Sequence, residues 1–374
     1  MYRSVFGTEL ESEVVGLKTQ DGARVMGTLV WRGERKPTTG VLSMHPASHG
    51  FRHFSLEGLG EVGLAALRLR SRFAGDDSTL IMEEVMLDIA AGVRFLRDWG
   101  CKKVVLFGHS GGGPLMSFYQ SQAEGPTVTS TPAGDPPDLT KAQLPAADAI
   151  ITSGAHLGRH HSLSERIDPS VVDENDPFAA HAELDMYNPK NGPPYTGEFL
   201  SRYRKAQMAR IEKITAGARK KLEEIRKRNH PVTHDLPFIV WRTEADPLYL
   251  DLSIEPNLRS PGNNRGDDTL ALNYAPKAQG RFSSLRSWLS QWGFSTSNAD
   301  TLRHIARISV PLLITQGTAD RSPMSRAKRI FEAAGTEDKS IYWAEGANHY
   351  YRGQKEILLK TCLAVAEWLQ ARGM

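Results

Sequence analysis

The feature that most constrains this chain is a single serine set among glycines where an apolar run ends. The stretch "VVLFGHSGGGPL" covers residues 104–115 and holds Ser110 within Gly-His-Ser-Gly-Gly. Each glycine loses extra backbone entropy on folding, so glycines concentrated at one point need a structural reason. A Gly-x-Ser-x-Gly sequence between a buried strand and a helix is typical of a nucleophile elbow, a strained turn that presents the serine hydroxyl. Ser110 is therefore the candidate nucleophile.

The same turn predicts a place where negative charge is stabilised. At the start of a helix the backbone N–H groups are free, and the helix dipole presents its positive end. The N–H of Gly111, directly after the serine, is therefore expected to face an oxyanion that develops on a substrate. The neighbouring glycines leave room for the turn to close and for a carbonyl group to approach.

Predicted strands alternate with predicted helices up to about residue 160 and again from about residue 305 to the end. Short apolar runs bounded by glycine or proline predict strands, and apolar residues three or four positions apart predict helices. This alternation predicts an α/β fold, with a mostly parallel sheet and helices on both faces. The expected strands are 13–33 (a hairpin), 39–46, 63–72, 102–108, 146–154, 310–317 and 339–346, and the expected helices are 82–100, 325–335 and 356–373.

The segment between these two blocks, residues 157–304, has a different character. It is rich in Pro, Asn, Asp and Tyr, and it contains one long helical pattern over residues 199–229. Eleven Lys and Arg against three Glu lie between Arg202 and Arg228, and a basic helix can bind nucleic acid or a membrane surface. The helix also carries one apolar stripe, which favours a solvent-exposed basic face on a helix packed over the sheet. The stripe leaves a homodimer open as well.

With the serine motif placed between a strand and a helix, the sequence resembles the α/β-hydrolase superfamily over the two flanking blocks. The resemblance implies a serine, an acid and a histidine in that chain order, each following a strand. It assigns the acid to Asp320 in "GTAD" and the base to His349 in "GANH". Asp246 is a competing acid, but it falls in the intervening segment and is not favoured. Relatives that open epoxides or remove halides carry aspartate in place of Ser110, so acyl transfer through a serine-bound intermediate is the expected chemistry.

The second oxyanion donor is expected in the stretch "HPASHGFRH", residues 45–53, which begins at the last two residues of the predicted strand 39–46. The superfamily usually has His-Gly there, whereas this chain has His45-Pro46. Proline has no N–H, so Ala47 is the expected donor. Three histidines in this loop, His45, His49 and His53, raise the question of a metal. No Asp, Glu or Cys joins them at a useful spacing, so no metal site is expected, and His45 is expected to shape the loop.

The resemblance also implies a domain organisation. Residues 1–156 and 305–374 are expected to form the core domain, and residues 157–304 a mainly helical cap over the serine. Such a cap shapes the substrate pocket and excludes water. Two tryptophans one helical turn apart fit either the core of the cap or an apolar pocket. The expected substrate contacts are His45, His109, Trp288, Trp292 and Tyr350.

These residues predict a serine hydrolase that cleaves carboxylic esters, with lactones and thioesters included, of a medium-sized and rather apolar substrate. Two alternatives remain open at this point. A carbon–carbon bond hydrolase acting on diketone ring-cleavage products uses the same three residues and a lid. A ligand-binding receptor on the same fold keeps them without turnover. The serine motif does not separate these alternatives.

Composition narrows the partners. The chain has 46 Lys and Arg against 43 Asp and Glu, and a net charge of +3 is too small to argue for nucleic acid. No apolar stretch approaches the roughly 20 residues of a membrane span, and the first residues do not resemble a secretory signal. The two cysteines, Cys101 and Cys362, suit neither a disulfide framework nor a metal cluster. A cytoplasmic enzyme that acts on a small-molecule ester-type substrate, with no cofactor and no nucleic-acid or membrane partner, is therefore expected.

Overall fold

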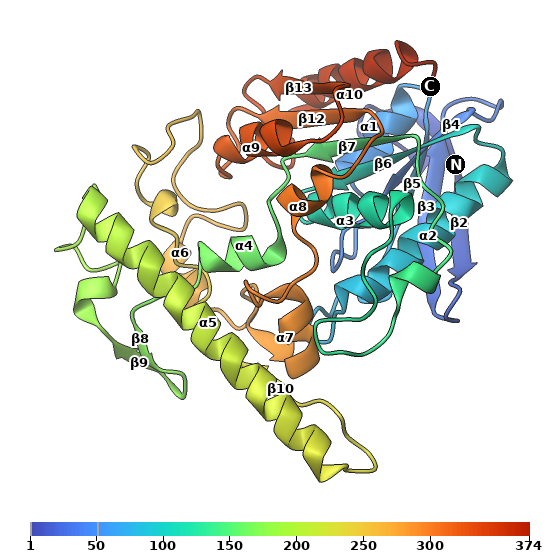
Figure 1. Ribbon diagram of the computed structural model, residues 1–374. Helices are drawn as coiled ribbons and strands as arrows, with labels where there is room; N and C mark the ends of the chain where they lie inside the picture. Colours follow the sequence, from blue (N-terminus) through green and yellow to red (C-terminus); the bar gives the residue numbers. More distant parts are fainter. Residues whose placement is uncertain (1, 51) are drawn as a thin grey trace.

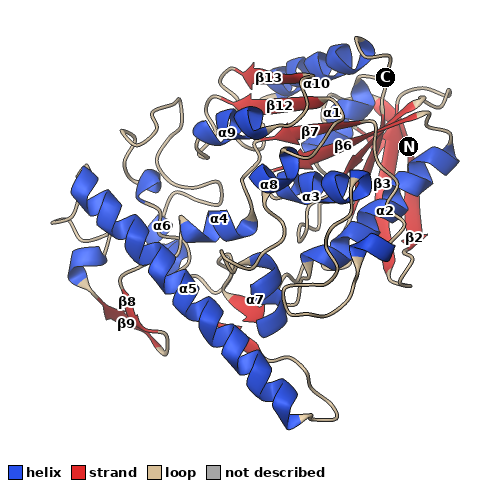
Figure 2. Ribbon diagram, in the orientation of Figure 1, coloured by secondary structure: helices blue, strands red, loops and turns tan. Residues whose placement is uncertain are grey.

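The computed structural model describes residues 2–50 and 52–374, and within them the main sheet has nine strands (Figures 1 and 2). The last six strands in the sheet, from β5 to β13, run parallel, and the strands before them pair antiparallel. The predicted mostly parallel sheet is thus confirmed. In spatial order the strands are β1 (Tyr2–Arg3), β2 (Glu9–Lys18), β3 (Arg24–Trp31), β5 (Ala65–Leu69), β4 (Thr39–Ser43), β6 (Lys103–His109), β7 (Ala149–Ser153), β12 (Leu312–Gly317) and β13 (Lys339–Ala344).

Helices cover both faces of this sheet, which explains why its central strands are continuous apolar runs. Every residue of β4, β5, β7 and β12 is buried. Each face of the sheet has its own apolar cluster. One face packs against α1 (Phe54–Glu61) and α10 (Lys355–Gln370). The other face packs against α2 (Met82–Trp99), α3 (Gly112–Glu124), α8 (Thr301–Ile305) and α9 (Ser325–Ala333).

The chain between β7 and β12 leaves the sheet and returns to it at α8 (Figure 1). We call residues 157–300 the cap segment. It ends before α8, because α8 packs on α3 and α9 within the helix layer of the core. The boundary expected from the sequence, residue 304, falls inside α8. The regular elements of the cap segment are α4 (Arg159–Ser164), β8 (Val171–Asp173), β9 (Asp176–Ala180), α5 (Gly197–Arg228), β10 (Pro237–Ile239), α6 (Thr269–Tyr274), β11 (Phe282–Ser284) and α7 (Leu285–Gln291), with short 3-10 turns at Ala182–Leu184 and Pro247–Tyr249; a further one, Leu139–Lys141, precedes β7.

The long basic helix, α5, packs its apolar stripe within the cap segment. Tyr203, Ile211 and Leu222 are buried, and α5 contacts α7. Most of its basic side chains are exposed, as expected, and four of them form ion pairs, among them the buried Arg210 with Glu174 at 2.7 Å. The stripe is therefore covered by this chain itself. No helix within the described residues is long and apolar enough to cross a membrane.

Candidate active site

The serine motif folds as a sharp turn between β6 and α3. Ser110 has a φ of +53°, a left-handed conformation that a residue with a side chain adopts only at a cost in strain. A Cβ on Gly108 would lie 2.5 Å from the carbonyl oxygen of Gly112, and a Cβ on Gly113 would collide with Ala155. The glycines are therefore required where the turn closes and where α3 packs on the end of β7.

Asp320 and His349 form a buried pair at the same edge of the sheet. They follow β12 and β13, and the carboxyl ends of parallel strands meet at one edge, where ligands bind. His349 Nδ1 lies 2.7 Å from Asp320 Oδ2. Gly154, with a φ of +50°, ends β7 behind the pair, where a Cβ would lie 3.1 Å from that carboxylate oxygen. No residue that the structure describes hydrogen-bonds to His349 Nε2, which is therefore open to a second partner.

Asp320 is held as a carboxylate. Its burial opposes ionisation, but the charge of His349 and several hydrogen bonds outweigh this effect, so that the pKa of Asp320 is lowered. Its Oδ1 accepts the N–H of Ser322 at 2.8 Å and the amide of Asn264 at 3.3 Å. An ionised acid fixes the Nδ1–H tautomer of the imidazole and stabilises its cation. Asn264 comes from the cap segment, so the cap supports the acid directly.

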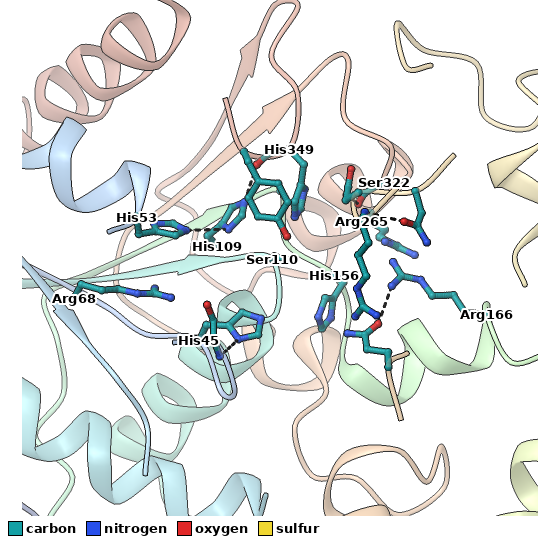
Figure 3. A pocket seen from close by; sticks show the side chains of 17 residues that line it. His45, His53, Arg68, His109, Ser110, His156, Arg166, Arg265, Ser322 and His349 are labelled. Carbon is teal, nitrogen blue, oxygen red and sulfur yellow. Dashed lines mark hydrogen bonds between the residues drawn. The ribbon is translucent and has the colours of Figure 1, made fainter. Parts of the chain in front are cut away.

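Ser110 and His349 line one cavity of about 210 Å³ between the sheet edge and the cap segment (Figure 3). Its walls are polar and basic, with five histidines and four arginines, and no Asp or Glu of the described residues lines it. This lining corrects the expectation of an apolar pocket. The lining residues are His45, Ser48, His53, Arg68, His109, Ser110, Gly154, His156, Arg166, Asn263, Asn264, Arg265, Gln279, Ser322, Arg326, His349 and Tyr350.

The two tryptophans expected as substrate contacts lie elsewhere. Trp288 and Trp292 are almost fully buried in the apolar cluster of the cap segment. The indole N–H of Trp288 donates to Thr215 on α5 at 2.9 Å, and the Arg159 guanidinium covers the ring of Trp292. The helical spacing of these residues reflects packing within the cap, so this expectation is corrected. Tyr350, in contrast, lines the cavity beside His349.

The loop after β4 presents a histidine where a backbone N–H was expected. His45 Nδ1 accepts the N–H groups of Ala47 and Ser48 at 3.2 and 3.0 Å. The N–H of Ala47 is thus directed at the imidazole, which corrects its expected role as an oxyanion donor. Because Nδ1 accepts, the proton of His45 lies on Nε2, and this atom lies 2.7 Å from the point where a Cβ of Gly111 would stand. Burial, then the charges of Arg159 and Arg68, hold the pKa of His45 well below its usual value.

A chain of neutral imidazoles anchors the loop of the base. His109 Nε2 lies 2.9 Å from the carbonyl oxygen of His349, so it donates and its Nδ1 accepts. His53 Nε2 lies 3.4 Å from that Nδ1, and His53 Nδ1 accepts the N–H of Ser55. Burial is the main cause that lowers the pKa of His109 and of His53 far below the usual value. Both ring nitrogens of His109 are therefore occupied, and it positions His349 while its ring lines the cavity.

Within the described residues, the set of side chains spaced to hold a metal ion lies outside this cavity. It consists of His160, His161 and Asp300. Asp300 Oδ2 lies 3.0 Å from His161 Nε2 and 3.3 Å from His160 Nε2, so hydrogen bonds account for the arrangement. The competing acid Asp246 pairs with Arg204 at 2.6 Å within the cap segment.

Several cavity residues were missed by sequence reasoning. Arg68 had a visible signal, because "AALRL" places one charged residue in an otherwise apolar strand. His156 had a weaker one, since it closely follows a strand at the sheet edge. Asn264 and Arg265 lie in an irregular part of the cap segment, where no periodic pattern locates a side chain.

No protein-family model matches the sequence, and a search of curated proteins gives no significant match. Solved structures match over nearly the whole chain. The α/β-hydrolase GrgF from Penicillium has a TM-score of 0.53 at 14% identity, covering 97% of this chain and 99% of its own. DcsB, solved in complex with a substrate analogue, has a TM-score of 0.53 at 12% identity, covering 96% of this chain and 99% of its own. A hypothetical protein from Pseudomonas aeruginosa has 0.51 at 13%, covering 94% and 89%.

At these identities the likeness concerns the fold. The chain has the α/β-hydrolase fold, as the sequence resemblance implied, with a long excursion between β7 and β12.

Proposed function

We propose that the protein hydrolyses carboxylic esters through an acyl-enzyme on Ser110. The observation that carries this proposal is the buried His349–Asp320 pair, which shares one cavity with a serine held in a strained turn. Nucleophile, base and orienting acid are the three roles that acyl transfer requires.

The reaction follows from these positions. His349 Nε2 takes the proton of Ser110 as Oγ bonds to the substrate carbonyl carbon. The bond from that carbon to the alcohol oxygen then breaks, and the imidazolium protonates the leaving alkoxide. Water then adds to the acyl carbon as His349 takes its proton. The bond from that carbon to Oγ breaks, the imidazolium returns the proton to Oγ, and the acid leaves with Ser110 restored. Asp320 stabilises the imidazolium in both halves of the cycle.

Two donors are assigned to the oxyanion in this mechanism. The N–H of Gly111 is one, and no described residue accepts a hydrogen bond from it. The other is Nε2–H of His45, a neutral imidazole next to Gly111. Because Nδ1 accepts two backbone N–H groups, Nε2 keeps its proton and is already a hydrogen-bond donor before negative charge develops.

Labelling with a fluorophosphonate followed by steady-state turnover of p-nitrophenyl acetate tests the proposal. Wild type should be labelled and should turn over many times, whereas Ser110→Ala should lose labelling and about 10⁴–10⁶-fold of kcat. Labelling without turnover would instead favour a binding protein on this fold. Hydrolysis of a vinylogous diketone in preference to the ester would favour carbon–carbon bond cleavage.

A further inference from the structure

Arg68 is a charged residue in the middle of the sheet. It lies on β5, where every residue is buried, and only 3% of its surface is exposed. A buried charge is strongly unfavourable unless another charge or several hydrogen bonds compensate it. Burial lowers the pKa of Arg68 to about 10, which still leaves the guanidinium protonated at neutral pH.

Arg68 lacks the partner that such a residue needs. Among residues 2–50 and 52–374, no carboxylate forms an ion pair with its guanidinium and no group accepts a hydrogen bond from it. Other buried arginines near the cavity behave differently. Arg326 is paired with Glu165, and Arg159 is paired with Asp77. The missing partner therefore distinguishes Arg68 from arginines that only stabilise the fold.

The guanidinium of Arg68 lines the cavity of Ser110. In Figure 3 it extends between His53 and His45, on the other side of Ser110 from Arg166 and Arg265. Gly50 lies against it, where a Cβ would be 3.4 Å from Nη2. The charge of Arg68, after burial, is the largest cause that lowers the pKa of His53. The cation thus sits among neutral groups, facing the space that a substrate fills.

The charge balance of the cavity favours an anion bound at Arg68. Arg265 pairs with Glu244 at 2.5 Å, and Arg166, which donates to Gln279, lies in the field of Glu244, Asp246 and Glu165. These three carboxylates are paired with Arg265, Arg204 and Arg326, so Arg166 shares their field without an ion pair of its own. Arg68, in contrast, has no carboxylate of the described residues in its surroundings. The flat fork of a guanidinium matches a carboxylate with two parallel hydrogen bonds.

We infer that Arg68 binds a carboxylate of the substrate, so that the protein acts on esters of short dicarboxylic acids that keep one free carboxylate. This inference rests on the proposed ester hydrolysis for its reaction, and on Arg68 alone for its specificity. A cavity of about 210 Å³ is small beside the roughly 300–1,000 Å³ of ordinary ligand sites, which limits the acid to a short chain.

Binding to a variant without turnover tests the carboxylate site apart from the chemistry. Calorimetry with Ser110→Ala should detect monomethyl glutarate and should show dimethyl glutarate bound roughly 10- to 150-fold more weakly. Adding Arg68→Met should remove this preference, whereas Arg97→Met, at an exposed arginine on α2, should keep it. Equal binding of the two esters, or an unchanged preference in the Arg68→Met background, would overturn the inference. Tighter binding of inorganic phosphate than of glutarate would overturn the assignment to a carboxylate.

The thermal stability of Arg68→Met provides a second test. A binding role for Arg68 predicts that the variant is more stable than wild type, whereas a structural role predicts that it is less stable. Arg68→Met removes an uncompensated buried charge and keeps the volume, so its thermal unfolding midpoint should rise above that of wild type. A lower midpoint would mean that Arg68 stabilises the fold and would overturn the inference.

Kinetics then connects the site to the reaction. Mono-p-nitrophenyl glutarate should exceed p-nitrophenyl pentanoate in kcat/KM by roughly 10- to 150-fold in wild type. Arg68→Met should abolish this ratio while still reacting with a fluorophosphonate. Loss of labelling and of all turnover in wild type, with Arg68-dependent binding retained, would refute the ester hydrolysis and leave the carboxylate site standing. Hydrolysis of both esters with equal kcat/KM would refute only the proposed specificity for a carboxylate.

Discussion

The two walls of the cavity are built in different ways. On the sheet side, Ser110, His349 and Arg68 lie within strands or in loops directly after them, where backbone hydrogen bonds fix their positions. On the cap side, Arg166 and Arg265 lie in irregular chain and are held by side-chain partners. The sheet wall thus carries the candidate reaction chemistry and an uncompensated cation. On the cap wall, Arg265 is paired with Glu244, and Arg166 donates to Gln279 in the field of carboxylates that pair with other arginines.

The largest expected effect on the sheet wall is a loss of stability when the pH is lowered. His109 and His156 are buried, and burial is the main cause that lowers the pKa of each well below its usual value. Unfolding lets them bind protons near pH 6.5, so their contribution to stability is complete above that pH and is lost as the pH falls below it. Each of these two histidines should lower the free energy of unfolding by about 1.4 kcal/mol for every pH unit below 6.5.

Urea unfolding at several pH values between 7.5 and 4.5 measures this effect. His156→Gln should reduce the pH slope by about one proton, because it removes one of the titrating groups. A slope that stays flat between pH 6.5 and 5 would contradict the neutral histidine cluster.

Substitution of His45 tests the chemistry of the same wall. His45→Ala removes the Nε2–H assigned to the oxyanion and should lower kcat by about 10²–10³-fold with KM little changed. The steady-state rate of p-nitrophenyl acetate hydrolysis measures it. His49→Ala, an exposed histidine of the same loop outside the cavity, is the matched control and should keep most of the activity. Equal losses in both variants would mean that the loop, and not the imidazole, matters.

The smallest expected effect lies on the cap wall. Asn264→Ala removes one hydrogen bond to Asp320, and because that bond lowers the pKa of Asp320, the pKa should rise in the variant. A single such bond contributes about 1 kcal/mol, so kcat should fall about fivefold. A loss as large as that of His45→Ala would show that the two walls are equally critical. Ester turnover at pH 7.5 measures the difference.

The same division explains what could be predicted from the sequence. The elbow at Ser110 and the strands before it follow from local patterns, whereas the positions of Asp320 and His349 follow from the chain order that the family resemblance implies. The sequence favours Ala47 as a donor because Pro46 has no N–H, but the fold of the loop directs the N–H of Ala47 at His45, which sequence spacing does not reveal. Helical spacing at Trp288 and Trp292 predicts burial without saying against which neighbour. Arg68 was visible as a charge in a buried strand, yet its lack of a partner depends on distant residues.

The hydrogen bonds that join the cap segment to Asp320 have a mechanical consequence. Asn257 donates to the carbonyl oxygen of Asp320 at 2.8 Å, Leu258 donates to that of Thr318 at 3.0 Å, and Asn264 donates to the carboxylate. Residues 257–264 therefore connect the cap wall of the cavity directly to Asp320 and to the end of β12. A motion that lifted this stretch would break these three hydrogen bonds and leave the carboxylate of Asp320 held, among the described residues, by the N–H of Ser322 and by His349 alone. A substrate that entered beside this stretch would leave all the hydrogen bonds of Asp320 intact, so the same few residues couple access to the cavity with the support of Asp320.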